Sequence, residues 1–293
     1  MTAESASPWR ALFCPASLGV SLKRYLQEQP ADTAVLAMSA AVAAQQASLA
    51  EALESMLGAA PSDKTPPAPP VEWLSDAIIR ISQAIAEHSP RASTGLKALS
   101  AAVQQFAGAR LLAAADGDVE ALEELVAAAE LPPDAALFVL RQAIQPLMAW
   151  SHGARALSLT DLPFPTRRYC PACGGQPLMG KHIEPDGHRY LRCGNCGNEW
   201  AFPRIGCPGC GETDAGKFEA LFVDGDEGHR IYICKTCMQY IKISDERLLG
   251  GRVHLPLEDI VTLHLDELGV ERGYRSVSQG SQPPTVQAND MSH

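Results

Sequence analysis

The sequence predicts an α+β fold in which an N-terminal all-α helical bundle precedes two tandem four-cysteine modules and a C-terminal helix. Two observations carry this prediction. From Ala31 to about Arg155, apolar residues return every three or four positions, which is the periodicity of amphipathic helices. After Pro163 and Pro165 the chain changes to short runs of glycine, cysteine, aromatic and β-branched residues, which are typical of strands and tight turns.

The chain is long enough for more than one domain, because 293 residues of which 46% are hydrophobic can bury a sizeable core. We expect the all-α domain to span residues 1–165. Two rubredoxin-like or zinc-ribbon modules should follow at 166–205 and 206–250, and a C-terminal helix at 251–275. The end of the chain is polar and lacks periodicity, so we expect a disordered tail at 276–293.

About five helices are expected in the first domain. Asp116 and Asp118 suit a helix start, because short carboxylates accept hydrogen bonds from the free amides of a first turn. The proline-rich run 61–70 should separate two helices as a linker. The predicted apolar stripes lie within 35–56, 73–85, 96–111, 122–126 and 137–148.

No catalytic set is evident in the helical half. Gln45, Gln46 and Glu54 are predicted to lie on a solvated helix face. Cys14 stands apart from the other cysteines, and we expect a small buried or half-buried thiol there. His152 has no ligand-type residue beside it, so a structural or solvent-facing role is expected.

The other eight cysteines form four Cys-x-x-Cys pairs, which is the ligand complement of two tetrahedral sulfur sites. Two residues between the cysteines allow a tight turn that directs both sulfur atoms at one point. Gly174 and Gly211, each following a pair, tolerate the positive φ that such a turn needs. The predicted metal ligands are Cys170, Cys173, Cys193, Cys196, Cys207, Cys210, Cys234 and Cys237.

The cysteine segment repeats one pattern, in which a pair, a hairpin and a strand lead to the next pair. The repeat favours sequential sets, with the first pair joined to the second and the third to the fourth. Interleaved pairing stays open by spacing alone. Iron and zinc stay open as well, because four thiolates in a tetrahedron suit both metals.

Four thiolates close a metal's coordination sphere, so structural or electron-carrying sites are expected rather than hydrolytic ones. A thioredoxin-like role would need a cysteine at a helix start after a βα pattern, and none of the four pairs has that setting. The histidines of this half are not needed as ligands and are predicted to be surface or packing residues: His182, His188, His229, His254 and His264.

The charge balance disfavours nucleic acid as a partner. The formal net charge is -10, and the segment 166–267 holds 12 Lys and Arg against 15 Asp and Glu. The first residues do not read as a secretory signal, and no run of eighteen apolar residues occurs. We therefore expect a cytoplasmic protein without membrane insertion, in a compartment that keeps thiols reduced. The oligomeric state is left open.

Motifs around the cysteines allow a closer interpretation. They are Tyr190-Leu191-Arg192-Cys193-x-x-Cys196-x-x-Glu199-Trp200, Arg204-x-x-Cys207-x-x-Cys210-Gly211, Cys234-x-x-Cys237-x-x-Tyr240-Ile241-Lys242-Ile243, and the helical segment 258–266. Over about 169–274 the sequence resembles the formate dehydrogenase accessory protein family, the FdhE type. The resemblance implies a cytoplasmic, non-catalytic maturation factor that binds the catalytic subunit of a respiratory formate dehydrogenase before its export. It also implies rubredoxin-like iron in both four-cysteine sites, with zinc as the alternative.

Two other functions are kept beside this one: a rubredoxin-like electron-transfer protein that acts on a client enzyme, and a zinc-ribbon adaptor.

Some neighbours of the cysteines also have simple expected roles. Trp200 should pack over the first site and exclude water from it. Glu199 and Arg204 should form a salt-bridged or solvated pair.

Overall fold

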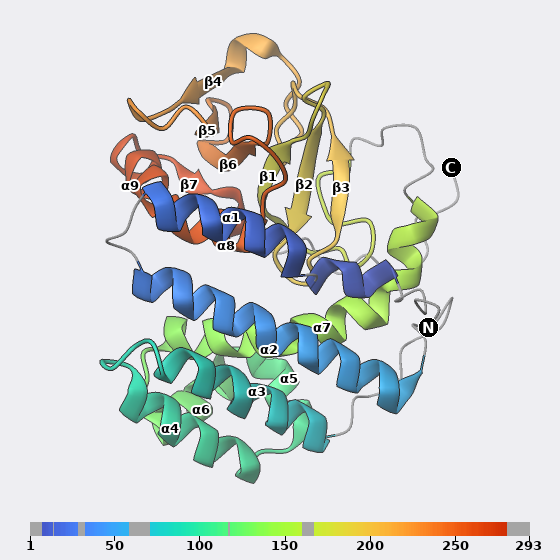
Figure 1. Cartoon of the computed structure of the whole chain (residues 1–293), viewed down its shortest axis with the longest axis vertical. Helices are drawn as coiled ribbons and strands as arrows, with labels where there is room; N and C mark the ends of the chain where they lie inside the picture. Colours follow the sequence, from blue (N-terminus) through green and yellow to red (C-terminus); the bar gives the residue numbers. More distant parts are fainter. Residues whose placement is uncertain are drawn as a thin grey trace.

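The structure is a computed structural model that describes residues 8–13, 15–28, 33–58, 71–116, 118–159 and 167–279. Helices α2 to α7 form one half of the molecule and the β-sheet forms the other (Figure 1). Helices α1 and α8 lie between these halves. The predicted α+β class, with helices first and cysteine modules second, is confirmed.

The helical half buries one continuous core that is rich in leucine, isoleucine and alanine. Asp118 caps α6 as predicted, because its carboxylate accepts a hydrogen bond from the amide of Ala121 at 2.9 Å. The elements are η1 (Pro8–Phe13), α1 (Pro15–Glu28), α2 (Thr33–Leu57), α3 (Val71–Ala86), α4 (Ser93–Ala102), η3 (Val103–Gln105), α5 (Gly108–Asp116), α6 (Val119–Ala129) and α7 (Pro133–Leu159).

The described residues hold more helices in this half than the five expected. Helix α1 was not predicted, and the stripe expected at 96–111 is divided into α4 and α5. The chain becomes extended at Phe106, and at Gly108 a Cβ atom would lie 2.8 Å from the side chain of Val71. The divided stripe thus reflects a close tertiary contact that periodicity does not report. Cys14, the proline-rich run 61–70 and the expected boundary near 165 lie outside the described residues.

Helix α2 is long and apolar enough, by length and composition, to cross a membrane, and among the described residues it alone passes that test. The core helix of a bundle passes the same test. Its side chains Val42, Leu49 and Leu53 are buried in the core of the helical half, where α2 contacts α3 and α7. In this structure α2 is a packing helix.

The two cysteine modules share one sheet. The first module contains β1 (Pro177–His182), β2 (Arg189–Cys193) and β3 (Glu199–Phe202), and the second contains β4 (Phe218–Leu221), β5 (His229–Cys234) and β6 (Gln239–Asp245). Each module is antiparallel within itself, and the strand order is β3-β2-β1-β6-β5-β4. The short β7 (Arg275–Ser276) adds parallel to β6. The two repeated modules thus form one continuous β-sheet.

A parallel pairing of β1 with β6 joins the modules, with Gly180 opposite Ile243. Gly180 is needed at this joint, because a Cβ atom there would lie 2.6 Å from the carbonyl oxygen of Tyr190 and 2.8 Å from the side chain of Ile243. The close approach of three strands depends on the missing side chain.

The C-terminal helix is two helices, α8 (Leu255–Val261) and α9 (Leu263–Glu271), where one was expected. Thr262 separates them, and its Oγ1 donates to the carbonyl oxygen of Glu258 at 2.6 Å. Helix α8 contacts α1 and α2 on one side and β1 and β6 on the other, so it connects the two halves.

The tail prediction is wrong for its first residues. Ser276 and Val277 are buried, and the one-turn helix η5 (Val277–Gln279) packs against β1 and β6. Val277 is apolar and covers the first-module core, which composition alone did not indicate. The rest of the predicted tail, 280–293, lies outside the described residues.

Candidate metal centres and the interdomain pocket

The eight predicted ligands come together as the two sequential sets, one in each module: Cys170, Cys173, Cys193 and Cys196, then Cys207, Cys210, Cys234 and Cys237. In each set the four sulfur atoms lie within 4.8 Å of one another. In the first set, sulfur to sulfur distances are 3.6 Å for Cys170 to Cys196 and 3.4 Å for Cys173 to Cys193. In the second set, they are 3.6 Å for Cys207 to Cys237 and 3.7 Å for Cys210 to Cys234. A tetrahedron with metal to sulfur bonds of about 2.3 Å has edges of about 3.8 Å. Both sets therefore have nearly the dimensions of a four-thiolate metal site.

All four Cys-x-x-Cys turns have the same backbone shape. The residue after each second cysteine has positive φ: 76° at Gly174, 72° at Gly197, 83° at Gly211 and 55° at Met238. Each donates its amide hydrogen to the carbonyl oxygen of the first cysteine of its pair, at 2.9 to 3.2 Å. The expected role of Gly174 and Gly211 is confirmed. Met238 has a side chain but adopts the left-handed backbone conformation that the other three turns place at glycine.

The first set behaves electrostatically as a shared thiolate. Hydrogen bonds from the thiols of Cys173, Cys193 and Cys196 hold the pKa of Cys170 far below its usual range. The pKa values of Cys193 and Cys196 are raised in return, chiefly through their bonds to Cys170. Four sulfurs this close cannot all carry charge unless a cation lies among them, and a bound metal ion would displace the remaining protons.

The first set is enclosed by apolar side chains. Trp200 packs in the same core cluster as Cys170 and Cys193, as expected, and its indole nitrogen donates to the carbonyl oxygen of Arg167 at 3.0 Å. Met148 of α7 packs against this cluster from the helical half. Asn198 directs its amide at the sulfur of Cys170 from 3.9 Å. The first candidate centre thus lies at the boundary between the two halves.

The second set is more open, since Cys210 and Cys237 are half-buried, and it has a buried cation beside it. Arg189 of β2 is 2% exposed and forms no ion pair with any described residue. Its Nη1 donates to the carbonyl oxygen of Gly206, the neighbour of Cys207, and its guanidinium lies over the ring of Tyr232. Burial lowers the pKa of Arg189 to about 10. Four thiolates around a divalent ion would leave two negative charges, which would offset this buried cation.

Neither four-cysteine group includes a histidine among the described residues. His182 is buried beside Asp245, and burial lowers its pKa to about 4. His229 has a role that the sequence did not reveal. Its Nδ1 lies 2.6 Å from Asp226 and its Nε2 lies 2.9 Å from the buried carboxylate of Glu258.

The network around Glu258 joins the two halves of the molecule. Ser21 of α1 donates to Glu258 at 2.8 Å, and Tyr25 donates to its other carboxylate oxygen. Arg24 approaches the same carboxylate at 3.7 Å. Because these residues lie more than 230 positions apart in the chain, sequence spacing could not place them together.

Of the two alternatives for Glu199 and Arg204, the salt bridge between them is not formed. Glu199 instead lies 3.6 Å from Arg192 on the neighbouring strand β2 and 2.9 Å from Lys181 on β1, the next strand beyond it. Arg204 is exposed beyond the end of β3. Cross-strand neighbours are nearer to Glu199 than a residue that follows it in the chain.

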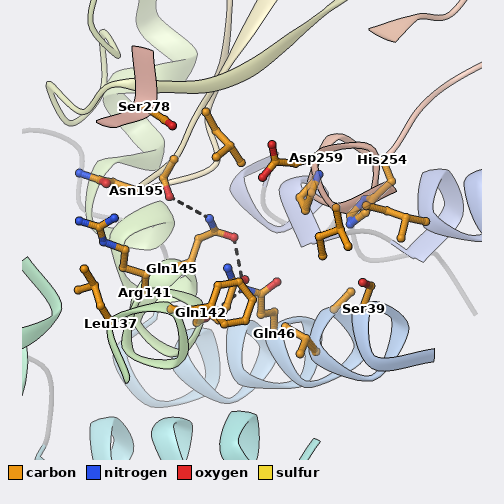
Figure 2. Close-up of a pocket in the computed structure, with 18 of the residues that line it drawn as sticks. Ser39, Gln46, Leu137, Arg141, Gln142, Gln145, Asn195, His254, Asp259 and Ser278 are labelled. Atoms are coloured by element: carbon orange, nitrogen blue, oxygen red, sulfur yellow. Dashed lines mark hydrogen bonds between the residues drawn. The ribbon is translucent and has the colours of Figure 1, made fainter. Parts of the chain in front are cut away.

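A pocket of about 410 Å³ lies between the two halves. Helices α2 and α7, α8, the turn of Cys193 to Cys196, and η5 line it. Gln46 was predicted to be solvated, but it is 6% exposed and donates to the side chains of Gln142 and Gln145. Gln145 in turn donates to the carbonyl oxygen of Gly194 at 3.5 Å. Figure 2 shows this chain of amide groups reaching from α2 across α7 to the turn beside Asn195.

Comparison with known proteins agrees with the motif resemblance. Residues 169–204 match the family model described as "FdhE, central domain". A "Protein FdhE homolog" of Aquifex aeolicus (strain VF5) is 33% identical over 116 residues, which are 39% of this chain and 41% of that protein. A "Protein FdhE homolog" of Stutzerimonas stutzeri (strain A1501) is 34% identical over 149 residues, which are 49% of this chain and 47% of that protein. These matches span less than half the length of each relative.

The fold is matched over a greater length. The crystal structure of the FdhE protein from Pseudomonas aeruginosa has a TM-score of 0.62 with 23% sequence identity, covering 97% of this chain and 98% of that one. The resemblance that the cysteine motifs indicated is confirmed: the chain is similar to FdhE proteins in sequence over part of its length and in fold over nearly all of it.

Proposed function

We propose that this protein is a cytoplasmic accessory protein that binds the catalytic subunit of a respiratory formate dehydrogenase and is needed for its maturation. It holds one metal ion in each four-cysteine site, with iron favoured by the FdhE resemblance and zinc as the alternative. The observation that carries this proposal is the pair of sequential four-cysteine sets in a chain that resembles FdhE proteins.

A binding role is supported by the chemistry of the two sets. Four thiolates leave a bound ion without an open position for a substrate or for water, and structural metal sites of this kind contribute directly to folding. The first set packs against α7, and its second turn lines the interdomain pocket. The metals would therefore hold a surface in shape, and the protein would act as a chaperone rather than as an enzyme.

An electron-transfer role is the second candidate, and one observation favours it. Cys210 and Cys237 of the second set are half-buried, so a bound iron there would lie near the surface. Protein purified without oxygen should be analysed for its metal and its visible spectrum. An absorption band that reductant bleaches would support redox cycling, and colourless zinc-loaded protein would exclude it.

A genetic experiment tests the accessory function itself. A strain that lacks this protein should lose formate-dependent respiration and regain it with the wild-type chain. The Cys14→Ser variant should restore respiration as well, because Cys14 belongs to neither set, whereas Cys193→Ser should not. Normal formate-dependent respiration in the deletion strain would contradict the proposal.

A further inference from the structure

We propose that the interdomain pocket and a second cavity beside it on α7 bind an extended, uncharged and mainly aliphatic peptide segment of about five residues. The assignment of this segment to the client protein rests on the proposed function. The ability of the groove to bind such a peptide can be tested without any client.

The two cavities are adjacent along α7 and share lining residues. Each has a volume of about 410 Å³, and Arg141 and Asn195 line both of them. From Phe138 in the first cavity to Met148 in the second, α7 rises about 15 Å. An extended chain rises about 3.3 Å per residue, so about five residues would lie along this face. The volumes of the two cavities suit a bound peptide segment rather than a single small ion.

One side of the groove is apolar, and no described residue covers it. Phe138 is 39% exposed although it lies on a helix whose other face is buried in the bundle core. Leu137, Ile144 and Met148 continue the apolar strip along α7. An exposed aromatic side chain on a concave apolar surface is typical of a site that a partner's side chains cover.

The groove is lined by few charged side chains, and they are of both signs. Asp134 and Arg141 have opposite charges and lie two turns apart on α7, and neither forms an ion pair that crosses the groove within the described residues. Asp259 lies 2.8 Å from Lys242 Nζ, which also lies 2.6 Å from Asp266, and burial raises the pKa of Asp259. Burial lowers the pKa of His254 to about 3, so its ring is neutral at pH 7. A phosphate, a nucleotide or a strongly charged peptide would meet side chains of both signs rather than a cluster of one sign, whereas an uncharged segment would lose little on desolvation.

Side-chain amides supply hydrogen bonds that suit a peptide backbone. Within the described residues Gln46 Nε2 is used in the network, but its Oε1 accepts no bond and Gln142 Nε2 donates none. One free acceptor and one free donor, close together, match the N–H and C=O groups of an extended chain. Figure 2 shows Gln46 and Gln142 beside each other at the pocket, with Arg141 at its edge.

The first test uses a defined probe. Acetyl-Leu-Ala-Val-Leu-Ala-amide, with a fluorophore on a Gly-Ser spacer, is titrated with the full metal-loaded chain and followed by fluorescence anisotropy. Binding should weaken at least about tenfold in Phe138→Asp, and also when two Leu of the probe are replaced by Glu or by Lys. Val119→Asp is the control, because Val119 is an exposed apolar residue on α6, outside the groove. Absent binding, equal binding of the charged probes, or full affinity of Phe138→Asp would overturn the proposal.

A second measurement does not depend on a disruptive substitution. The photoreactive amino acid p-benzoyl-phenylalanine is placed at position 138, and at position 119 as the control. With the purified catalytic subunit, a crosslink from position 138 alone to an uncharged aliphatic segment is expected. A crosslink to a second copy of this chain, or to its own residues 280–293, would overturn the client assignment. If the wild-type chain binds the pentapeptide but not the subunit, the proposed function fails and the groove stands.

Discussion

His229 Nε2 and Glu258 Oε2 lie 2.9 Å apart in a buried network that connects the sheet to α1 of the helical half. Burial alone would lower the pKa of His229, but the carboxylates of Asp226 and Glu258 outweigh it and raise the pKa to about 9. Three further titratable groups lie in this network. Burial and Glu258 raise the pKa of Tyr25. Arg24 approaches Glu258, and His264 lies beside Asp226. The raised pKa favours a protonated imidazole between two acids, within the network through which Ser21 and Tyr25 of α1 contact Glu258.

This network predicts a loss of stability in alkaline solution. A raised pKa means that the stabilisation is fully present below about pH 6.5, the ordinary value for histidine, and is lost as the pH rises through about 9. The loss should be on the order of 3 kcal/mol in the free energy of unfolding. Denaturant unfolding of metal-loaded protein from pH 6 to pH 10 measures it. His229→Gln should be less stable at pH 6 and show a flatter profile, and an equal slope in both proteins would refute this interpretation.

Met238 is predicted to be the least favourable residue among the four Cys-x-x-Cys turns. It holds a φ of 55° where Gly174, Gly197 and Gly211 hold similar values without a side chain, and its own side chain is 43% exposed. Met238→Gly should stabilise the protein by about 0.5 to 1 kcal/mol, since the relief of backbone strain exceeds the entropy that glycine adds to the unfolded chain. Gly174→Ala should do the opposite. A lower thermal midpoint for Met238→Gly would contradict the prediction.

Arg189 should tune the second metal site. Replacing it with Met removes a buried cation beside Cys207, so the metal affinity of that site should fall by roughly ten- to a hundredfold. Competition with a chelator measures the affinity. Arg272→Met, at an exposed position after α9, is the control and should leave it unchanged. Without metal, Arg189→Met should be no less stable than the wild type, because the buried charge of Arg189 in the metal-free wild type lacks a counter-charge. Equal metal affinity in Arg189→Met and wild type would exclude the role.

Removing one ligand separates the two centres. Cys193→Ser should reduce the metal content from two ions to one and loosen the turn whose Gly194 accepts from Gln145. Pentapeptide binding to the groove should weaken as well, since Asn195 lines both cavities. Cys237→Ser should also remove one ion but leave peptide binding intact, because no residue of its turn lines the groove. Equal losses of peptide binding in both variants would contradict this division.

Local patterns predicted the parts of this molecule that depend on local geometry. Cysteine spacing indicated both ligand sets, and apolar periodicity indicated the stripes of α2, α3, α6 and α7. The joint at Gly180, the network at Glu258 and the buried position of Gln46 were not predicted. Each depends on contacts between distant segments, which neither spacing nor periodicity encodes. Gly180 within β1 is the kind of residue that signals a close approach, but it does not identify the partner strand.

The most direct test of the account is the binding of a formate dehydrogenase catalytic subunit to the purified, metal-loaded chain, measured by co-elution and light scattering. The account predicts a stable complex with the wild-type chain and with Cys14→Ser, and a weakened one with Phe138→Asp. A metal-loaded, folded chain that leaves the catalytic subunit unbound would contradict it.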